Sequence, residues 1–81
     1  MRVRVLYFGR LKELSGSSEE SVELGDGACI EDLFVRCSWL RPELLKFRPS
    51  LVAARNREFA AWDTVLHAGD EVGFLPPVSG G

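Results

Sequence analysis

The last six residues of the chain form the pattern with the clearest chemical use: Pro76, Pro77, Val78, Ser79, Gly80 and Gly81. A diproline fixes two φ angles and removes two backbone donors, so it stops a strand and projects the following residues outward. We expect residues 76–81 to be a flexible tail, which could reach about 20 Å when extended. The two glycines then present a carboxylate without neighbouring side chains, at a tip slim enough for a channel that would exclude a Cβ.

The carboxylate of Gly81 is ionised at neutral pH and is therefore a poor electrophile. It needs activation, most simply as an acyl-adenylate formed with ATP. Attack by a sulfur donor would then give a thiocarboxylate, a soft nucleophile that can deliver sulfur elsewhere. Attack by an amine would instead give an isopeptide tag. Both uses need the same bare glycine tip, so the tip alone does not choose between them.

The remaining reactive side chains do not form a recognisable catalytic or metal-binding pattern. His67 is the single histidine and lies in a polar stretch, where we predict a solvated turn. The two cysteines, Cys29 and Cys37, are too few for a disulfide framework and lack metal-ligand spacing. We predict that Cys37 packs in the core and that Cys29, near a helix start, has no partner base. The sequence therefore predicts no metal site and no permanently bound cofactor.

The composition of the chain limits the classes of protein that it can be. Its 81 residues are 46% hydrophobic and 27% charged, an ordinary balance for one small globular domain. Ten basic and twelve acidic side chains argue against nucleic acid as a partner. Since no apolar run is long enough to span a membrane and the opening residues do not form a secretory signal, we expect a cytoplasmic protein with reduced thiols.

The tail must be positioned by the elements before it, and the hydrophobic pattern predicts where they lie. A stripe at i, i+3, i+4 and i+7 (Ile30, Leu33, Phe34, Cys37) indicates an amphipathic helix from about residue 28 to 40. Pro42 favours a second, short helix over 42–47. Alternation and turn residues predict five strands, at 1–8, 20–24, 51–55, 59–62 and 71–75. We therefore predict an α+β domain over residues 1–75, with the last strand parallel to the first in the middle of one sheet.

This arrangement predicts a docking surface at the base of the tail. Val3, Val5 and Tyr7 carry no charge on their side of the first strand, so Leu6 and Phe8 would lie on the other side. Leu75 also points away from the expected core, so the parallel pairing would place it beside Phe8. Phe59 follows a turn and could join them. An exposed apolar patch of this kind indicates contact with a partner, although these side chains could instead cap the core.

Two further expectations concern the other large side chains. Trp39 and Trp62 are predicted to be packing residues. The loosely basic stretch (Arg36, Arg41, Lys46, Arg48) is predicted to be a solvated face.

Three segments make the sequence resemble the small subunits of molybdopterin synthase, the MoaD family. They are VRVLYFGRLKELSG at 3–16, AARN at 53–56, and the ending from Leu66 to Gly81 with GDEVGFLPPVSGG. The resemblance covers the whole chain, and the PPVSGG ending is its most specific part. It implies a ubiquitin-like β-grasp fold, in agreement with the predicted order of elements.

The resemblance also implies a function as a sulfur carrier rather than an enzyme. A ubiquitin-activator-like enzyme would use ATP to adenylate Gly81, and a sulfur donor enzyme would convert it to a thiocarboxylate. The tail would then enter the large subunit of molybdopterin synthase, in a heterotetramer of two small and two large subunits. There it would give sulfur to cyclic pyranopterin monophosphate, and two deliveries would build the dithiolene of molybdopterin.

Other uses of the same fold stay open at this point. The chain could be a protein modifier joined to lysines through Gly81, or a thiamin-type sulfur carrier with the same Gly-Gly end. From a different class, it could be a free-standing β-grasp interaction module without terminal chemistry.

Overall fold

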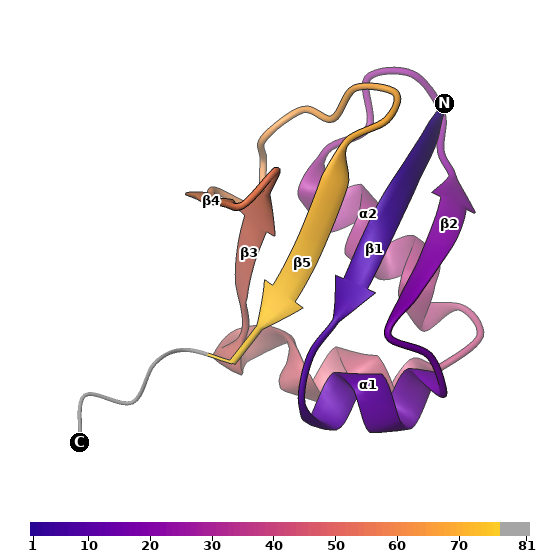
Figure 1. The fold of residues 1–81 in the computed structure, drawn as a ribbon, viewed down its shortest axis with the longest axis vertical. Coiled ribbons are helices and arrows are strands. Elements are labelled where there is room, and N and C mark those ends of the chain that lie inside the picture. Colours follow the sequence, from indigo (N-terminus) through magenta and orange to yellow (C-terminus); the bar gives the residue numbers. More distant parts are fainter. Residues whose placement is uncertain (77–81) are drawn as a thin grey trace.

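The computed structural model describes residues 1–76, where one mixed sheet of five strands carries a helix across one face (Figure 1). The elements in chain order are β1 (Arg2–Tyr7), α1 (Arg10–Ser15), β2 (Glu19–Glu23), α2 (Ile30–Ser38), the 3₁₀ helix η1 (Pro42–Ser50), β3 (Val52–Arg55), β4 (Glu58–Ala60) and β5 (Glu71–Leu75). The strand order is β2-β1-β5-β3-β4, with β5 parallel to β1 and antiparallel to β3. The predicted α+β plan and the central parallel pair are confirmed.

Strand β1 separates an apolar face from a charged one. Val3, Val5 and Tyr7 are buried, whereas Arg2 and Arg4 are exposed. Because charged side chains lose their hydration on burial, this alternation decides which face of the sheet covers the core. The opposite face, which we call the open face, is not covered by α2.

Helix α2 closes the core with the predicted stripe, since Ile30, Leu33, Phe34 and Cys37 are all buried. The ring of Phe34 packs edge-on against Phe74 of β5, with 5.1 Å between the ring centroids. At the helix start the carboxylate of Asp32 accepts a hydrogen bond from the backbone N–H of Cys29 at 2.9 Å. This bond lowers the pKa of Asp32 and satisfies one of the free donors of the first turn.

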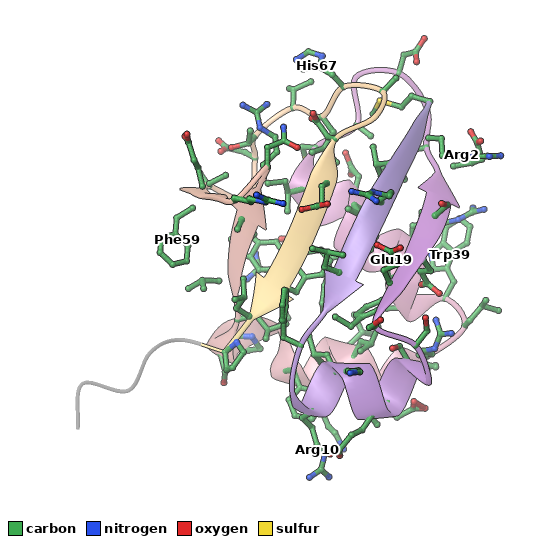
Figure 2. All side chains as sticks on the ribbon, in the orientation of Figure 1. Arg2, Arg10, Glu19, Trp39, Phe59 and His67 are labelled. Atoms are coloured by element: carbon green, nitrogen blue, oxygen red, sulfur yellow. The ribbon has the colours of Figure 1, made fainter. Side chains whose placement is uncertain are left out.

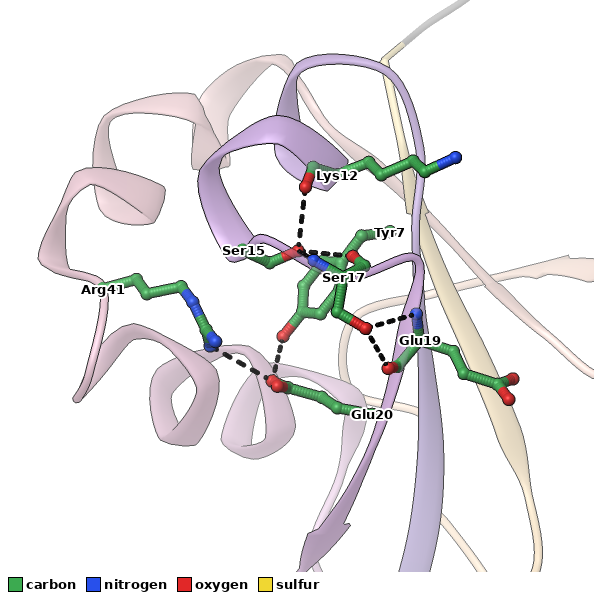
Figure 3. A network of polar contacts seen from close by, with 7 residues as sticks. All are labelled: Tyr7, Lys12, Ser15, Ser17, Glu19, Glu20 and Arg41. Atoms are coloured by element: carbon green, nitrogen blue, oxygen red, sulfur yellow. Dashed lines mark hydrogen bonds and ion pairs between the residues drawn. The ribbon is translucent and has the colours of Figure 1, made fainter.

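A polar network fixes the end of β1 (Figure 3). The hydroxyl of Tyr7 donates to Oε1 of Glu20 at 2.5 Å, and Nη1 of Arg41 lies 3.3 Å from the same oxygen. Burial, followed by the bonds to its neighbours, raises the pKa of Tyr7. The network joins β1, β2 and the start of η1 and so fixes the position of Tyr7. Phe8, the residue after Tyr7, therefore has a fixed backbone position at the end of the strand.

The turn between β3 and β4 is a two-residue hairpin loop in which both residues are left-handed, with φ of 50° at Asn56 and 72° at Arg57. The amide Nδ2 of Asn56 donates to Asp70 at 3.0 Å, and its Oδ1 accepts the backbone N–H of Glu71 at 3.0 Å. The turn is therefore tied to the beginning of β5.

The predicted surroundings of three side chains were wrong, namely those of Trp39, Arg41 and Arg48. Trp39 is 66% exposed, with the guanidinium of Arg36 4.6 Å from its ring centroid. It follows Val35 by four residues, on the outward side of the helix, so the core cannot reach it. By contrast, the predicted packing of Trp62 is confirmed, since its half-buried ring stacks on Phe74 at 5.5 Å between centroids.

The other two errors concern cations in the basic stretch. Arg48 makes two hydrogen bonds to Glu31, at 2.7 and 3.0 Å, and its guanidinium lies 3.4 Å from the ring centroid of Trp62. Arg41 is held by Glu20. Arg41 and Arg48 are therefore only partly exposed, because carboxylates from distant segments of the chain bind them. Arg36 and Lys46 are exposed, as predicted.

The element boundaries also differ slightly from the predicted ones. Helix α2 ends at Ser38, η1 extends to Ser50, and β4 covers Glu58–Ala60 rather than 59–62. The first and last residues of each element depend on packing against neighbouring strands and helices, which local residue preferences do not predict.

Candidate functional site

The central strand β5 leads directly to the predicted tail. Leu75 is the last residue of the strand and Pro76, the next residue, is exposed. Pro77, Val78, Ser79, Gly80 and Gly81 lie outside the residues that the structure describes, so the roles predicted for them stay predictions. What the structure does define is the surface from which this segment starts.

That surface carries a shallow apolar hollow of about 220 Å³ on the open face. We call its apolar lining the open-face patch: Leu6, Phe8, Ala54, Phe59, Gly73 and Leu75. Phe8 is 41% and Phe59 76% exposed. Figure 2 shows Phe59 projecting from the edge of the sheet, whereas Trp39 lies at its other side, next to β2. The structure thus brings Phe8, Phe59 and Leu75 together, and their contact with a partner stays a prediction.

The register of the strands explains the shape of the patch. Leu6 pairs with Gly73 and Tyr7 with Phe74, so the position after Tyr7 falls beside Leu75 on the open face. Ala54 pairs with both Gly73 and Phe59. Two small residues therefore lie between larger apolar ones, and this difference in size leaves the hollow.

A second apolar groove, of about 650 Å³, continues from the patch along β4 to the first residue of the tail. It shares Phe59 and Leu75 with the patch and also reaches Trp62 and Pro76. Contiguous apolar surface of this kind marks interaction sites more often than isolated exposed side chains do. The apolar surface therefore extends from the middle of the sheet to the residue where the tail begins.

Charged side chains of β1, β2 and the start of β5 border the patch. Glu71 pairs with Arg4, and Nη1 of Arg4 lies 3.7 Å from Glu19. Burial opposes ionisation of Asp70, but the hydrogen bonds from Asn56 and from the backbone N–H of His67 outweigh it and lower the pKa of Asp70.

The reactive side chains elsewhere have structural surroundings. His67 is exposed in a turn and Cys37 is buried, as predicted. Burial raises the pKa of the Cys37 thiol to about 11. Cys29 is half-exposed at the start of α2. Across residues 1–76 we find no group of three His, Cys, Asp or Glu side chains placed to hold a metal ion, and no helix long and apolar enough to cross a membrane.

Three members of the site were not predicted from the sequence, namely Ala54, Arg57 and Gly73, whereas Leu6 was placed on the same face as Phe8. The period-2 alternation could have found Gly73 once the register was known, since it shares a face with Leu75. Ala54 and Arg57 depend on the hairpin geometry, for which the Asn56-Arg57 pair was the available signal.

The mixed five-stranded sheet, its central parallel pair and the helix across one face define an α+β domain of the ubiquitin-like β-grasp class. A family model described as the ThiS family matches residues 5–81. The chain belongs to this family.

Two relatives of the chain share one protein name. The chain is 40% identical, over its full length and that of the relative, to a protein of Chlamydomonas reinhardtii named molybdopterin synthase sulfur carrier subunit. A Mycobacterium tuberculosis protein of the same name is 35% identical, with 100% of this chain and 99% of the relative covered.

Solved structures show the same fold. Small archaeal modifier protein 1 from Haloferax volcanii matches with a TM-score of 0.84 at 29% identity, and both chains are covered completely. A complex of subunits 1 and 2 of molybdopterin-converting factor from Helicobacter pylori contains a chain that matches with a TM-score of 0.70 at 26% identity, again with full coverage of both.

Proposed function

We propose that the chain is the sulfur carrier subunit of a molybdopterin synthase and that the carboxylate of Gly81 carries the sulfur. The observation that carries this proposal is the similarity along the entire chain to relatives that are named for this function. The open-face patch supports it, because a carrier must be held by partners at the base of its tail.

The proposed cycle uses the terminal carboxyl group as a reversible attachment point. A carboxylate oxygen of Gly81 attacks the α-phosphorus of ATP on the activating enzyme, and pyrophosphate leaves. Hydrosulfide released by a donor enzyme then attacks the acyl carbon, and AMP leaves as the carbon–sulfur bond forms. The sulfur of the resulting thiocarboxylate bonds to a carbon of cyclic pyranopterin monophosphate and displaces an oxygen group there. Hydrolysis of the thioester formed in this way leaves the sulfur on the pterin and restores the carboxylate. Two such transfers supply the dithiolene.

In this proposal the large synthase subunit supplies the acid–base groups and the small chain is a stoichiometric, non-catalytic carrier. The Helicobacter pylori complex supports such a partner, since it pairs subunits 1 and 2 of a molybdopterin-converting factor. We infer the same pairing here, in a heterotetramer of two small and two large subunits, with a cytoplasmic location.

A second candidate function is a ubiquitin-like modifier attached to lysines through Gly81. The likeness to small archaeal modifier protein 1 of Haloferax volcanii favours it, because that protein is named as a modifier and has the same fold. A thiamin-type sulfur carrier would use the same terminus, and the names of the curated relatives favour the molybdopterin pathway over it.

Intact-mass spectrometry of the chain from its native cells separates the two functions. The carrier predicts a form heavier than the encoded chain by the difference between one sulfur and one oxygen atom. The modifier predicts a ladder of covalent conjugates on a denaturing gel. Conjugates without the sulfur-bearing form would contradict the proposal, and a chain lacking Gly80 and Gly81 should lose both signals.

A further inference from the structure

Arg57 occupies a backbone conformation that its residue type does not favour. Its φ of 72° is left-handed, and it is the second residue of a two-residue hairpin loop. Glycine is the preferred residue at that position, because it has no Cβ to crowd the carbonyl oxygen. A strained arginine in place of glycine is a reason to ask what its side chain does.

The side chain of Arg57 lines the same hollow as Phe8, Phe59 and Leu75. It is exposed, and the loop that carries it is fixed at Asn56 by the bonds to Asp70 and Glu71. The cation is therefore presented at the rim of the open-face patch from a tethered turn.

The charges around the hollow leave this cation uncompensated. Glu71, the acidic residue that lines the hollow, is paired with Arg4. Within residues 1–76, Arg57 takes part in no ion pair and no side-chain hydrogen bond. Among residues 1–76, Arg57 therefore presents a cation without an ion-pair partner at the rim of the patch, whereas the carboxylates of Glu19 and Glu71 share the single cation of Arg4. A partner that covers the patch would meet apolar side chains and, beside them, an arginine able to bind a carboxylate in a bidentate geometry.

We propose that Arg57 is a specificity-determining residue of the docking surface, and that it pairs with a carboxylate of the large synthase subunit when that subunit covers the open-face patch. The inference rests on the proposed function for the identity of the partner. A charge at the rim of an interface acts mainly on the association rate and on its salt dependence.

The test measures association of the large subunit with the full chain by surface plasmon resonance at several salt concentrations. Arg57→Gly removes the charge and relieves the left-handed strain, so we expect an unchanged or higher unfolding temperature together with affinity about three- to fivefold weaker at low salt. Arg57→Glu should weaken binding by about tenfold or more, because it places like charges together. Arg57→Lys should retain most of the salt dependence.

Arg36→Glu provides a matched control, since it makes the same change of charge on the face of α2 away from the patch and should leave the association rate unchanged. Wild-type affinity and salt dependence in both Arg57→Gly and Arg57→Glu would overturn the inference. A loss confined to the adenylating enzyme would also overturn it, because the partner would then be wrong. Failure of the wild-type chain to bind the large subunit would instead contradict the proposed function.

Discussion

The ring of Phe8 lies over Gly73: a Cβ built on Gly73 would stand 3.1 Å from Cε2 of Phe8, closer than ordinary carbon–carbon contact. Gly73 belongs to the central strand and Phe8 follows the strand beside it. The missing side chain of Gly73 therefore allows the ring of Phe8 to lie close to the sheet. The orientation of an aromatic ring in the open-face patch depends on this glycine.

Replacing Gly73 should change the patch while preserving the fold. In Gly73→Ala the added methyl group lifts the Phe8 ring, which can move because it is partly exposed. We expect affinity for the large subunit to fall by about fivefold, near 1 kcal/mol, as measured by calorimetric titration. Gly25→Ala is the control, since a Cβ there meets no atom within 4 Å. Equal affinities for the two variants would contradict this role of Gly73.

The large side chains of the patch should act as anchors for the partner. Phe8→Ala, Phe59→Ala and Leu75→Ala are each expected to weaken large-subunit binding by about 2 kcal/mol, or about 30-fold in Kd. Because Phe59 is 76% exposed, the free energy of unfolding of Phe59→Ala should change by less than about 1 kcal/mol in urea denaturation.

Trp39→Ala is the matched control for these anchors, since Trp39 is also a large exposed aromatic residue but lies outside the patch. Its affinity should equal that of the wild type. If it loses as much affinity as Phe59→Ala, the partner does not bind at the open-face patch.

Asp70 should make the domain less stable in acid. Its pKa is lowered in the folded state, so the unfolded chain takes up a proton first as the pH falls. Its contribution is present above the unfolded pKa of about 4 and is lost as the pH falls through the lower folded value. Asp70→Asn should therefore give a flatter plot of unfolding free energy against pH below about pH 4. An acid limb as steep as that of the wild type would contradict this assignment.

The two cysteines should differ in reactivity with a disulfide reagent such as dithionitrobenzoate. Burial raises the pKa of Cys37 to about 11, so its thiol stays protonated and shielded in the native domain. One thiol, Cys29, should react in the native state and Cys37 only after unfolding. Cys29→Ala should remove the fast reaction, and a fast reaction that persists in this variant would place Cys37 at the surface.

The same shift in the Cys37 pKa predicts a loss of stability in alkali. The pKa of Cys37 in the folded state lies above that of a free thiol. The stabilisation that the protonated thiol contributes is therefore complete below about pH 8.5 and is lost as the pH rises through about 11. Cys37→Ala should flatten this alkaline limb.

The sequence was sufficient for the core and for the central parallel pair of strands. In the first strand, alternation placed the uncharged residues Val3, Val5 and Tyr7 on one face. In the helix, the 3.6-residue period placed the stripe beginning at Ile30 on one side. The structure buries both sets of side chains. The position of Leu75 opposite the core also followed from simple alternation along the last strand.

The sequence alone could not predict contacts between residues that lie far apart along the chain. Arg48 resembles other surface cations until Glu31 and Trp62 are found beside it. Gly73 is an ordinary strand residue until the ring of Phe8 is found over it. Arg57 becomes unusual only when the hairpin gives it a positive φ. Each of these depends on a tertiary contact or a turn geometry that residue types and spacing do not encode locally.

The central claim is that the carboxyl group of Gly81 carries the sulfur, and one variant tests it most directly. A chain with one additional alanine after Gly81 keeps the described domain intact but moves the carboxylate away from the Gly-Gly end. The measurement is the rate of molybdopterin formation by the large subunit, supplied with this chain, the activating enzyme, ATP and the sulfur donor. We predict no product above background, whereas the normal chain supports turnover. Product formation at the normal rate, with mass spectrometry showing that the alanine is still attached, would contradict the claim.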